Sequence, residues 1–143
     1  MKRILKALLG GVCLVLWGCS APDSVETFLR TSETTDGKFV FELDLSDSTA
    51  TYDIWFYTRV DSPARANLRL RPEWTSPSGQ TFSETVYMNP GGKGGAKELY
   101  RSGVRVKEPG IWTLNVGVGD FPKRFRGLGL ICRRNHNGTR QTS

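Results

Sequence analysis

Cys19 is the residue whose neighbours most clearly predict a chemical reaction, the acylation of its thiol. It closes the sequence Leu16-Trp17-Gly18-Cys19, which resembles the bacterial lipobox in placing a branched apolar residue and a small residue before the cysteine. The chain begins Met1-Lys2-Arg3 and continues with an apolar run over 7–17, the two regions of a secretory signal. This run is well short of the ~20 residues of a membrane-spanning helix. We therefore expect residues 1–18 to be a lipoprotein signal peptide and Cys19 to carry a diacylglyceryl group.

The expected lipid fixes where the protein resides. Each buried lipid CH₂ contributes roughly 0.8 kcal/mol, so two acyl chains hold a protein durably at a membrane. Ser20 follows Cys19, in place of the aspartate that retains some lipoproteins in the inner membrane. We expect a lipid anchor in the outer membrane and leave open whether the domain faces the periplasm or the outside.

The residue types that serve nucleophilic or metal chemistry are scarce in the rest of the chain. Cys13 lies in the predicted signal, which leaves Cys132 as the one free thiol. Because it follows Leu128 and Leu130 at alternate positions, we expect a buried structural thiol. The single histidine, His136, lies in a polar tail, which argues against a catalytic triad or a histidine metal cluster in the domain.

The carboxylates and glycines give no specific catalytic pattern either. Asp44, Asp47 and Asp53 flank one predicted loop, but their spacing is that of solvated turn residues and not of a calcium-binding loop. Residues 91–97 lack the spacing of a phosphate-binding loop. The carboxylates that could form a glycoside-hydrolysing pair are Glu42, Glu73 and Glu84. Nothing in the sequence brings two of them together, so we expect no enzyme activity, no cofactor and no metal.

Aromatic and basic side chains are the remaining candidates for binding. Trp55 and Trp74 could stack on a sugar if one sheet face exposes them, and the competing interpretation for each is core filling. Arg59, Arg69 and Arg71 stand at alternate or outward positions of predicted strands and are candidate contacts for a protein partner.

The net charge of +6, from 20 Lys and Arg against 14 Asp and Glu, does not reside on the domain. Three cations belong to the predicted signal and three more follow Cys132. Between Cys19 and Cys132 this leaves 14 cations (20 − 6) against 14 carboxylates. A nucleic-acid-binding domain carries its excess charge on the fold, so we expect no nucleic-acid partner.

The elements that must position these residues are strands. From residue 38 onward, apolar and polar residues alternate, as in Phe39, Phe41 and Leu43, and turns rich in proline and glycine interrupt the pattern. The expected strands cover 38–45, 52–60, 66–74, 81–88, 98–106, 111–118 and 125–132. This predicts an all-β fold, a single antiparallel β-sandwich of seven to eight strands, jelly-roll or C2-like. We expect a flexible tether over 19–37, the sandwich over 38–133 and a disordered basic tail over 134–143.

Several of these segments together resemble the GldH family of gliding-motility-associated lipoproteins of the Bacteroidetes, of which this chain would be a divergent member. The segments that carry the resemblance, besides the lipobox, are Tyr52-Asp53-Ile54 with Thr58-Arg59, Asn67-Leu68-Arg69-Leu70, Ser76-Pro77-Ser78-Gly79, Glu108-Pro109-Gly110-Ile111-Trp112 and Leu128-Gly129-Leu130-Ile131. The resemblance implies a non-catalytic accessory lipoprotein linked to the gliding and type IX secretion machinery.

Two functions remain in competition at this point. The first is docking on envelope proteins, with Arg59, Arg69 and Arg71 as contacts. The alternative is a surface glycan-binding module of a polysaccharide-uptake system, with Trp55 or Trp74 as the stacking platform. A third, for which the sequence offers no test, is an inhibitor or immunity-type lipoprotein that binds one secreted enzyme.

Overall fold

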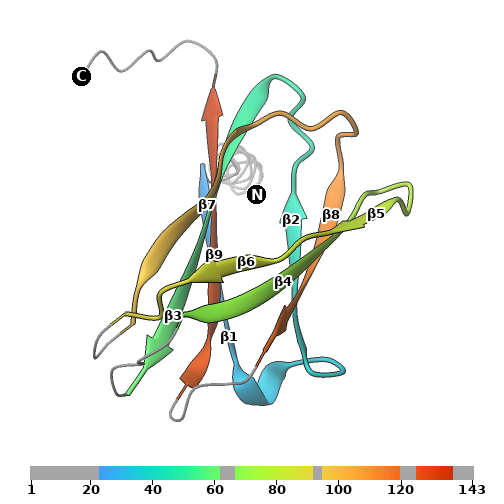
Figure 1. Cartoon of the computed structure of the whole chain (residues 1–143). Coiled ribbons are helices and arrows are strands. Elements are labelled where there is room, and N and C mark those ends of the chain that lie inside the picture. Colours follow the sequence, from blue (N-terminus) through green and yellow to red (C-terminus); the bar gives the residue numbers. More distant parts are fainter. Residues whose placement is uncertain (1–22, 62–66, 92–94, 120–124, 137–143) are drawn as a thin grey trace, which may run out of the picture.

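The protein is a sandwich of two antiparallel sheets in a computed structural model that describes residues 23–61, 67–91, 95–119 and 125–136 (Figure 1). The first sheet, sheet A, has the strand order β1-β9-β3-β7, and the second, sheet B, has the order β2-β8-β4-β5 with β6 also paired to β4. The strands are β1 (Ser24–Arg30), β2 (Lys38–Asp44), β3 (Ala50–Val60), β4 (Leu68–Thr75), β5 (Thr81–Ser83), β6 (Val86–Met88), β7 (Lys97–Val104), β8 (Ile111–Val118) and β9 (Phe125–His136). This confirms the predicted all-β sandwich.

Successive strands mostly alternate between the two sheets, as they do in a jelly roll. β5 and β6 together act as one strand along β4, because both pair with it in the same register. The break between them lies opposite Pro72, which has no N–H to donate to the ladder, although its carbonyl accepts the N–H of Glu84 at 3.1 Å. The predicted strand over 81–88 is therefore split at the position of a proline on its neighbour.

The core lies between the sheets and follows the predicted alternation. Phe39, Phe41 and Leu43 of β2 are buried while the residues between them are exposed. Each fully buried side chain of this size stabilises the fold by roughly 1.5–3 kcal/mol. β3 lies in the middle of sheet A, so its even-numbered residues from 50 to 60 are buried in the core and most of its odd-numbered ones are half-buried on the outer face.

The expected tether over 19–37 is wrong for part of its length. Residues 24–30 form β1, which pairs with β9 from Ser24 to Arg30, and a 3₁₀ turn, η2 (Thr31–Glu33), follows. Most side chains of β1 are exposed, so the apolar alternation that marks a strand is weak. The backbone pairing with β9 holds the segment instead.

The expected disordered tail begins too early as well. β9 continues to His136, because residues 134–136 pair with residues 50–52 of β3. Residues 137–143, Cys19 and the predicted signal peptide lie outside the described residues. Within the part of the chain that the structure describes, no helix is long and apolar enough to cross a membrane.

Candidate binding face

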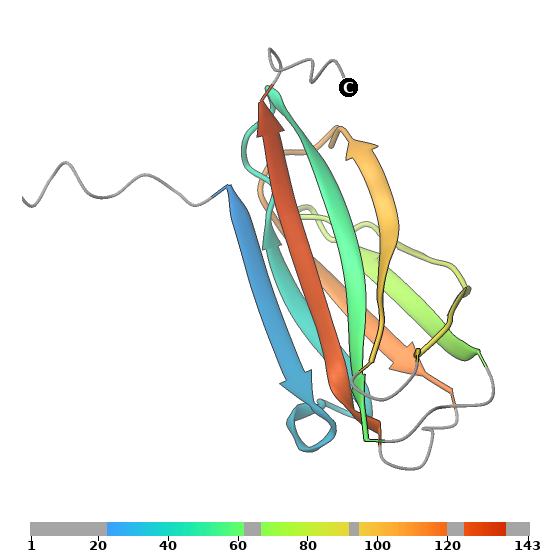
Figure 2. The same cartoon turned by 90° about the vertical axis from the view of Figure 1, so that its left-hand side faces the viewer.

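The outer face of sheet A gathers aromatic and cationic side chains from all four of its strands, which lie side by side in Figure 2. We call it the aromatic–cationic face. Its members are Phe28 of β1, Trp55, Tyr57 and Arg59 of β3, Lys97 of β7 and Arg133 of β9. An open hollow of about 580 Å³ lies on this face, and its lining includes Tyr57, Arg59 and Lys97.

Two glycines of β9 make room for the rings. Tyr57 pairs with Gly129, and a Cβ on that glycine would lie 2.0 Å from the Tyr57 ring. A Cβ on Gly127 would lie 2.7 Å from the ring of Phe28. Because the glycines leave these positions empty, the Phe28 and Tyr57 rings lie close over the backbone of β9 and stack on each other at 5.7 Å with an angle of 22°.

Trp55 lies between two cations on the same face. Lys97 Nζ is 5.1 Å and Arg133 Cζ is 4.8 Å from its ring centroid. Lys97 pairs with Tyr57 and Arg133 pairs with Asp53, so the cations approach Trp55 from opposite directions along β3. Exposed cation–π contacts of this kind contribute roughly 0.5–1 kcal/mol each.

The charges of this face are only partly neutralised. Arg59 lies 5.3 Å from the centroid of Phe28 and, like Lys97, has no carboxylate within ion-pair distance among the described residues. Arg133 is 3.7 Å from Asp53. Desolvation alone would raise the pKa of Asp53, but hydrogen bonds from the Gly103 N–H and from other neighbouring groups, with the Arg133 charge, hold it below its ordinary value. The face therefore offers two free cations beside three rings.

Tyr57 is held in place by a neighbour on β1. Burial, followed by a hydrogen bond with Glu26, raises the pKa of Tyr57 to about 12. The Tyr57 ring itself stacks on Phe28, which also belongs to β1.

The arginines that the sequence nominated together lie on two faces. Arg59 belongs to the aromatic–cationic face, whereas Arg69 and Arg71 project from β4 on the outer face of sheet B. Arg71 pairs with Gly117, and the neighbouring pairs bring together small and polar residues such as Glu73 with Asn115. One docking surface cannot contain all three arginines.

Trp74 is a core residue. It is 5 % exposed, and its Nε1–H donates to the Tyr100 hydroxyl at 3.1 Å. Phe82 and Tyr100 stack against the indole, each at 6.3 Å. Because these rings already stack on the indole and little of it is exposed, the predicted glycan-stacking role of Trp74 is wrong. Trp55 is less buried than Trp74, and its ring lies between Lys97 and Arg133.

The groups nominated for catalysis or metal binding do not assemble. The Cys132 thiol is half-buried, and burial followed by the nearby Asp53 charge raises its pKa to about 11, so it is protonated at neutral pH. The Glu84 carboxylate accepts hydrogen bonds from the Tyr100 hydroxyl and from Arg101. Among the described residues, no group of three or more histidine, cysteine, aspartate or glutamate side chains could hold a metal ion.

Sequence reasoning missed several members of the aromatic–cationic face. Phe28 was assigned to a tether, while Lys97 and Arg133 stood at the ends of predicted elements. The alternation along β3 is the pattern that indicates this face. Trp55 and Tyr57 alternate with buried residues, so they share the outer face of the sheet. Compared with protein-family models, curated proteins and solved structures, the chain matches none.

Proposed function

We propose that the protein is a non-catalytic, membrane-anchored envelope lipoprotein that docks a partner protein through the aromatic–cationic face. Cys19 carries the diacylglyceryl group that holds it in the outer membrane. The resemblance to the GldH family favours a partner in the gliding or type IX secretion machinery.

The observation that carries this proposal is the concentration of Phe28, Trp55 and Tyr57 with Arg59 and Arg133 on one sheet. Protein interfaces are enriched in aromatic residues and arginine, and these residues supply most of the binding energy. The rings and guanidinium groups already stack on one another in the free protein. Binding therefore immobilises few additional rotamers, which lowers its entropic cost.

Two further observations support a binding role over catalysis. The half-buried Cys132 thiol is protonated, and the Glu84 carboxylate is already engaged by Tyr100 and Arg101. Arg59 and Lys97, which have no carboxylate within ion-pair distance among the described residues, lie next to rings, an arrangement suited to recognition of carboxylates on a partner surface.

The alternative function, a surface glycan-binding module of a polysaccharide-uptake system, now rests on Trp55 alone. Its position on the outer face of sheet A favours this role, whereas Lys97 and Arg133 lie over the ring that a neutral sugar would have to cover. Titration of intrinsic tryptophan fluorescence with a panel of oligosaccharides separates the functions. The docking proposal predicts no spectral change, and a saturable shift that disappears in Trp55→Phe would favour the glycan module.

The docking proposal is tested by crosslinking in intact cells and affinity recovery of the tagged full-length protein, followed by mass spectrometry. The test variant is Arg59→Glu with Lys97→Glu, and the matched control is Arg69→Glu with Arg71→Glu, which makes the same change of charge on sheet B. We expect gliding or secretion components with the wild type and the control, and their loss with the test variant. Full recovery with the test variant, or recovery of polysaccharide-uptake porins instead, would overturn the proposal.

A further inference from the structure

The sandwich has two neighbouring sheet edges that are open. Among the residues that the structure describes, β1 pairs with β9 alone and β2 pairs with β8 alone, so each strand ends its sheet. Both edges lie on the same side of the sandwich, because residues of both strands line one cleft. An unpaired strand edge is a template for a further strand.

The direction of the β2 backbone shows which groups are free. Leu45 and Gly110 exchange two hydrogen bonds, at 2.9 and 3.3 Å. Since antiparallel pairs alternate, the odd-numbered residues of β2 bond to β8, and Val40, Glu42 and Asp44 direct their N–H and C=O groups away from it. Lys38 confirms this direction, because it exchanges its two bonds with Thr35 on the free side, at 2.9 and 3.0 Å. Three consecutive outward positions of β2 therefore offer backbone groups to a partner.

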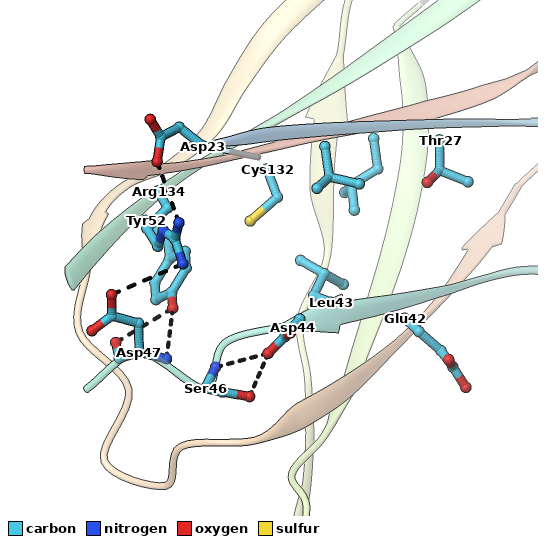
Figure 3. A pocket seen from close by; sticks show the side chains of 12 residues that line it. Asp23, Thr27, Glu42, Leu43, Asp44, Ser46, Asp47, Tyr52, Cys132 and Arg134 are labelled. Carbon is cyan, nitrogen blue, oxygen red and sulfur yellow. Dashed lines mark hydrogen bonds and ion pairs between the residues drawn. The ribbon is translucent and has the colours of Figure 1, made fainter. Parts of the chain in front are cut away.

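A cleft of about 440 Å³ opens beside this free edge, between β1 and β2. Its apolar lining comes from both sheets and includes Val25, Leu43, Leu130 and Cys132. Figure 3 shows Cys132 and Leu43 pointing toward one another across it. The opposite side of the sandwich, where β7 and β5 end the two sheets, has hollows of about 350 and 130 Å³. The cleft between β1 and β2 is larger than either, and it places apolar surface directly beside two open backbone edges.

The rim of the cleft is acidic. Its carboxylates are Asp23, Glu42, Asp44 and Asp47, and its one cation within the lining is Arg134. Arg134 lies 3.3 Å from Asp23 and 4.0 Å from Asp47, which leaves Glu42 and Asp44 without a cation partner among the residues that the structure describes. Both of these carboxylates belong to β2 itself.

We propose that an extended segment of a partner protein adds to the free edge of β2 as a further strand of sheet B. In this segment, apolar and basic residues alternate. Strand addition of this kind draws its affinity from main-chain hydrogen bonds and its specificity from pockets for alternate side chains. Residues of the added strand opposite Leu43 point into the cleft and cover its apolar lining. Residues opposite Glu42 and Asp44 point to the outer face and meet their carboxylates. This site is separate from the aromatic–cationic face, so either can fail alone.

The test is amide hydrogen exchange, followed by NMR on the isotope-labelled full-length protein in detergent, with two synthetic peptides as probes. One peptide alternates lysine with valine and the other alternates glutamate with valine. We expect the lysine peptide to slow exchange at Val40, Glu42 and Asp44 by at least about tenfold at saturation, and the glutamate peptide to leave it unchanged.

Three variants assign the effect to the β2 edge. Glu42→Pro removes an N–H that faces away from β8, a position where edge strands tolerate proline, and should abolish the protection. Glu42→Ala keeps that N–H and should retain part of the protection from exchange. Glu26→Pro makes the same change on the free edge of β1 and should leave the protection of the β2 amides unchanged.

The proposal is overturned if the protected amides are those of Ser24, Glu26 and Phe28, if the glutamate peptide protects as well as the lysine peptide, or if neither protects at millimolar concentration. Detergent chains that contact the Val25 and Leu43 methyl groups and persist when peptide is added would also overturn it. In that case the cleft would hold a lipid chain and not a strand.

Discussion

The outer faces of the two sheets differ in how the glycines of their central strands affect the side chains packed beside them. On sheet A, Gly127 and Gly129 stand in β9 between strands that carry Phe28 and Tyr57, and the rings lie in the space that the glycines leave. On sheet B, Gly117 stands in β8 between Lys38 and Arg71, and a Cβ there would find ordinary contacts at 3.8 Å. The strand glycines of sheet A therefore allow aromatic rings to lie close to the backbone, whereas Gly117 of sheet B has no ring beside it. This difference distinguishes the aromatic–cationic face from the outer face of sheet B.

The largest expected effect separates the two tryptophans that the sequence treated alike. Trp74→Ala should destabilise the fold by about 3–5 kcal/mol, as removal of a buried aromatic does. Trp55→Ala removes a half-exposed ring and should cost well under half as much. Chemical denaturation of both variants measures this, and equal losses would mean that Trp55 is a structural residue and not part of a binding surface.

The glycines provide the next comparison. A Cβ at Gly127 would lie 2.2 Å from the Leu29 carbonyl oxygen, so backbone must move, and Gly127→Ala should cost about 1–3 kcal/mol. Gly117→Ala meets no such obstacle and should be neutral or stabilise by up to about 1 kcal/mol, because glycine is unfavourable inside a strand. Denaturant midpoints give both values, and a similar cost at the two positions would remove the distinction between the faces.

Asp53, on the aromatic–cationic face, should contribute to the pH dependence of the free energy of unfolding at acid pH. Its pKa lies below the ordinary value of 3.8 in the folded protein. The stability that it contributes is therefore fully present above that pH and is lost as the pH falls through the lower, folded pKa. Asp53→Asn should flatten the decline of stability below about pH 4. Glu73→Gln on sheet B is the matched control, and a profile for Asp53→Asn that parallels the wild type would contradict the hydrogen-bonded arrangement.

The smallest effect concerns the cations around Trp55. Arg133→Ala should cost no more than about 1 kcal/mol, since it removes one exposed cation–π contact and a weak ion pair. It should still change the emission of Trp55. Arg71→Ala on the other face should leave both stability and emission unchanged. An unchanged emission spectrum in Arg133→Ala would show that the guanidinium does not lie on the indole in solution.

Much of the fold could be predicted because β2 and β8 have an apolar residue at every core-facing position, and β3 has one at every core-facing position except Thr58. β1 could not, since Ser24 to Arg30 is held by backbone pairing and buries few side chains. Trp74 and Trp55 look equivalent in the sequence, and only the positions of Phe82 and Tyr100 show that Trp74 is enclosed. Arg59 was nominated for its position, but its separation from Arg69 and Arg71 follows from the assignment of β3 and β4 to different sheets.

The central claim, that the aromatic–cationic face is the docking surface, is tested most directly by photocrosslinking in living cells. A photoreactive phenylalanine replaces Tyr57 in one version of the full-length protein and Arg71 in the other. The account predicts a discrete adduct with an envelope protein from position 57 and none from position 71. Adducts of equal yield from both positions, or an adduct from position 71 alone, would contradict it.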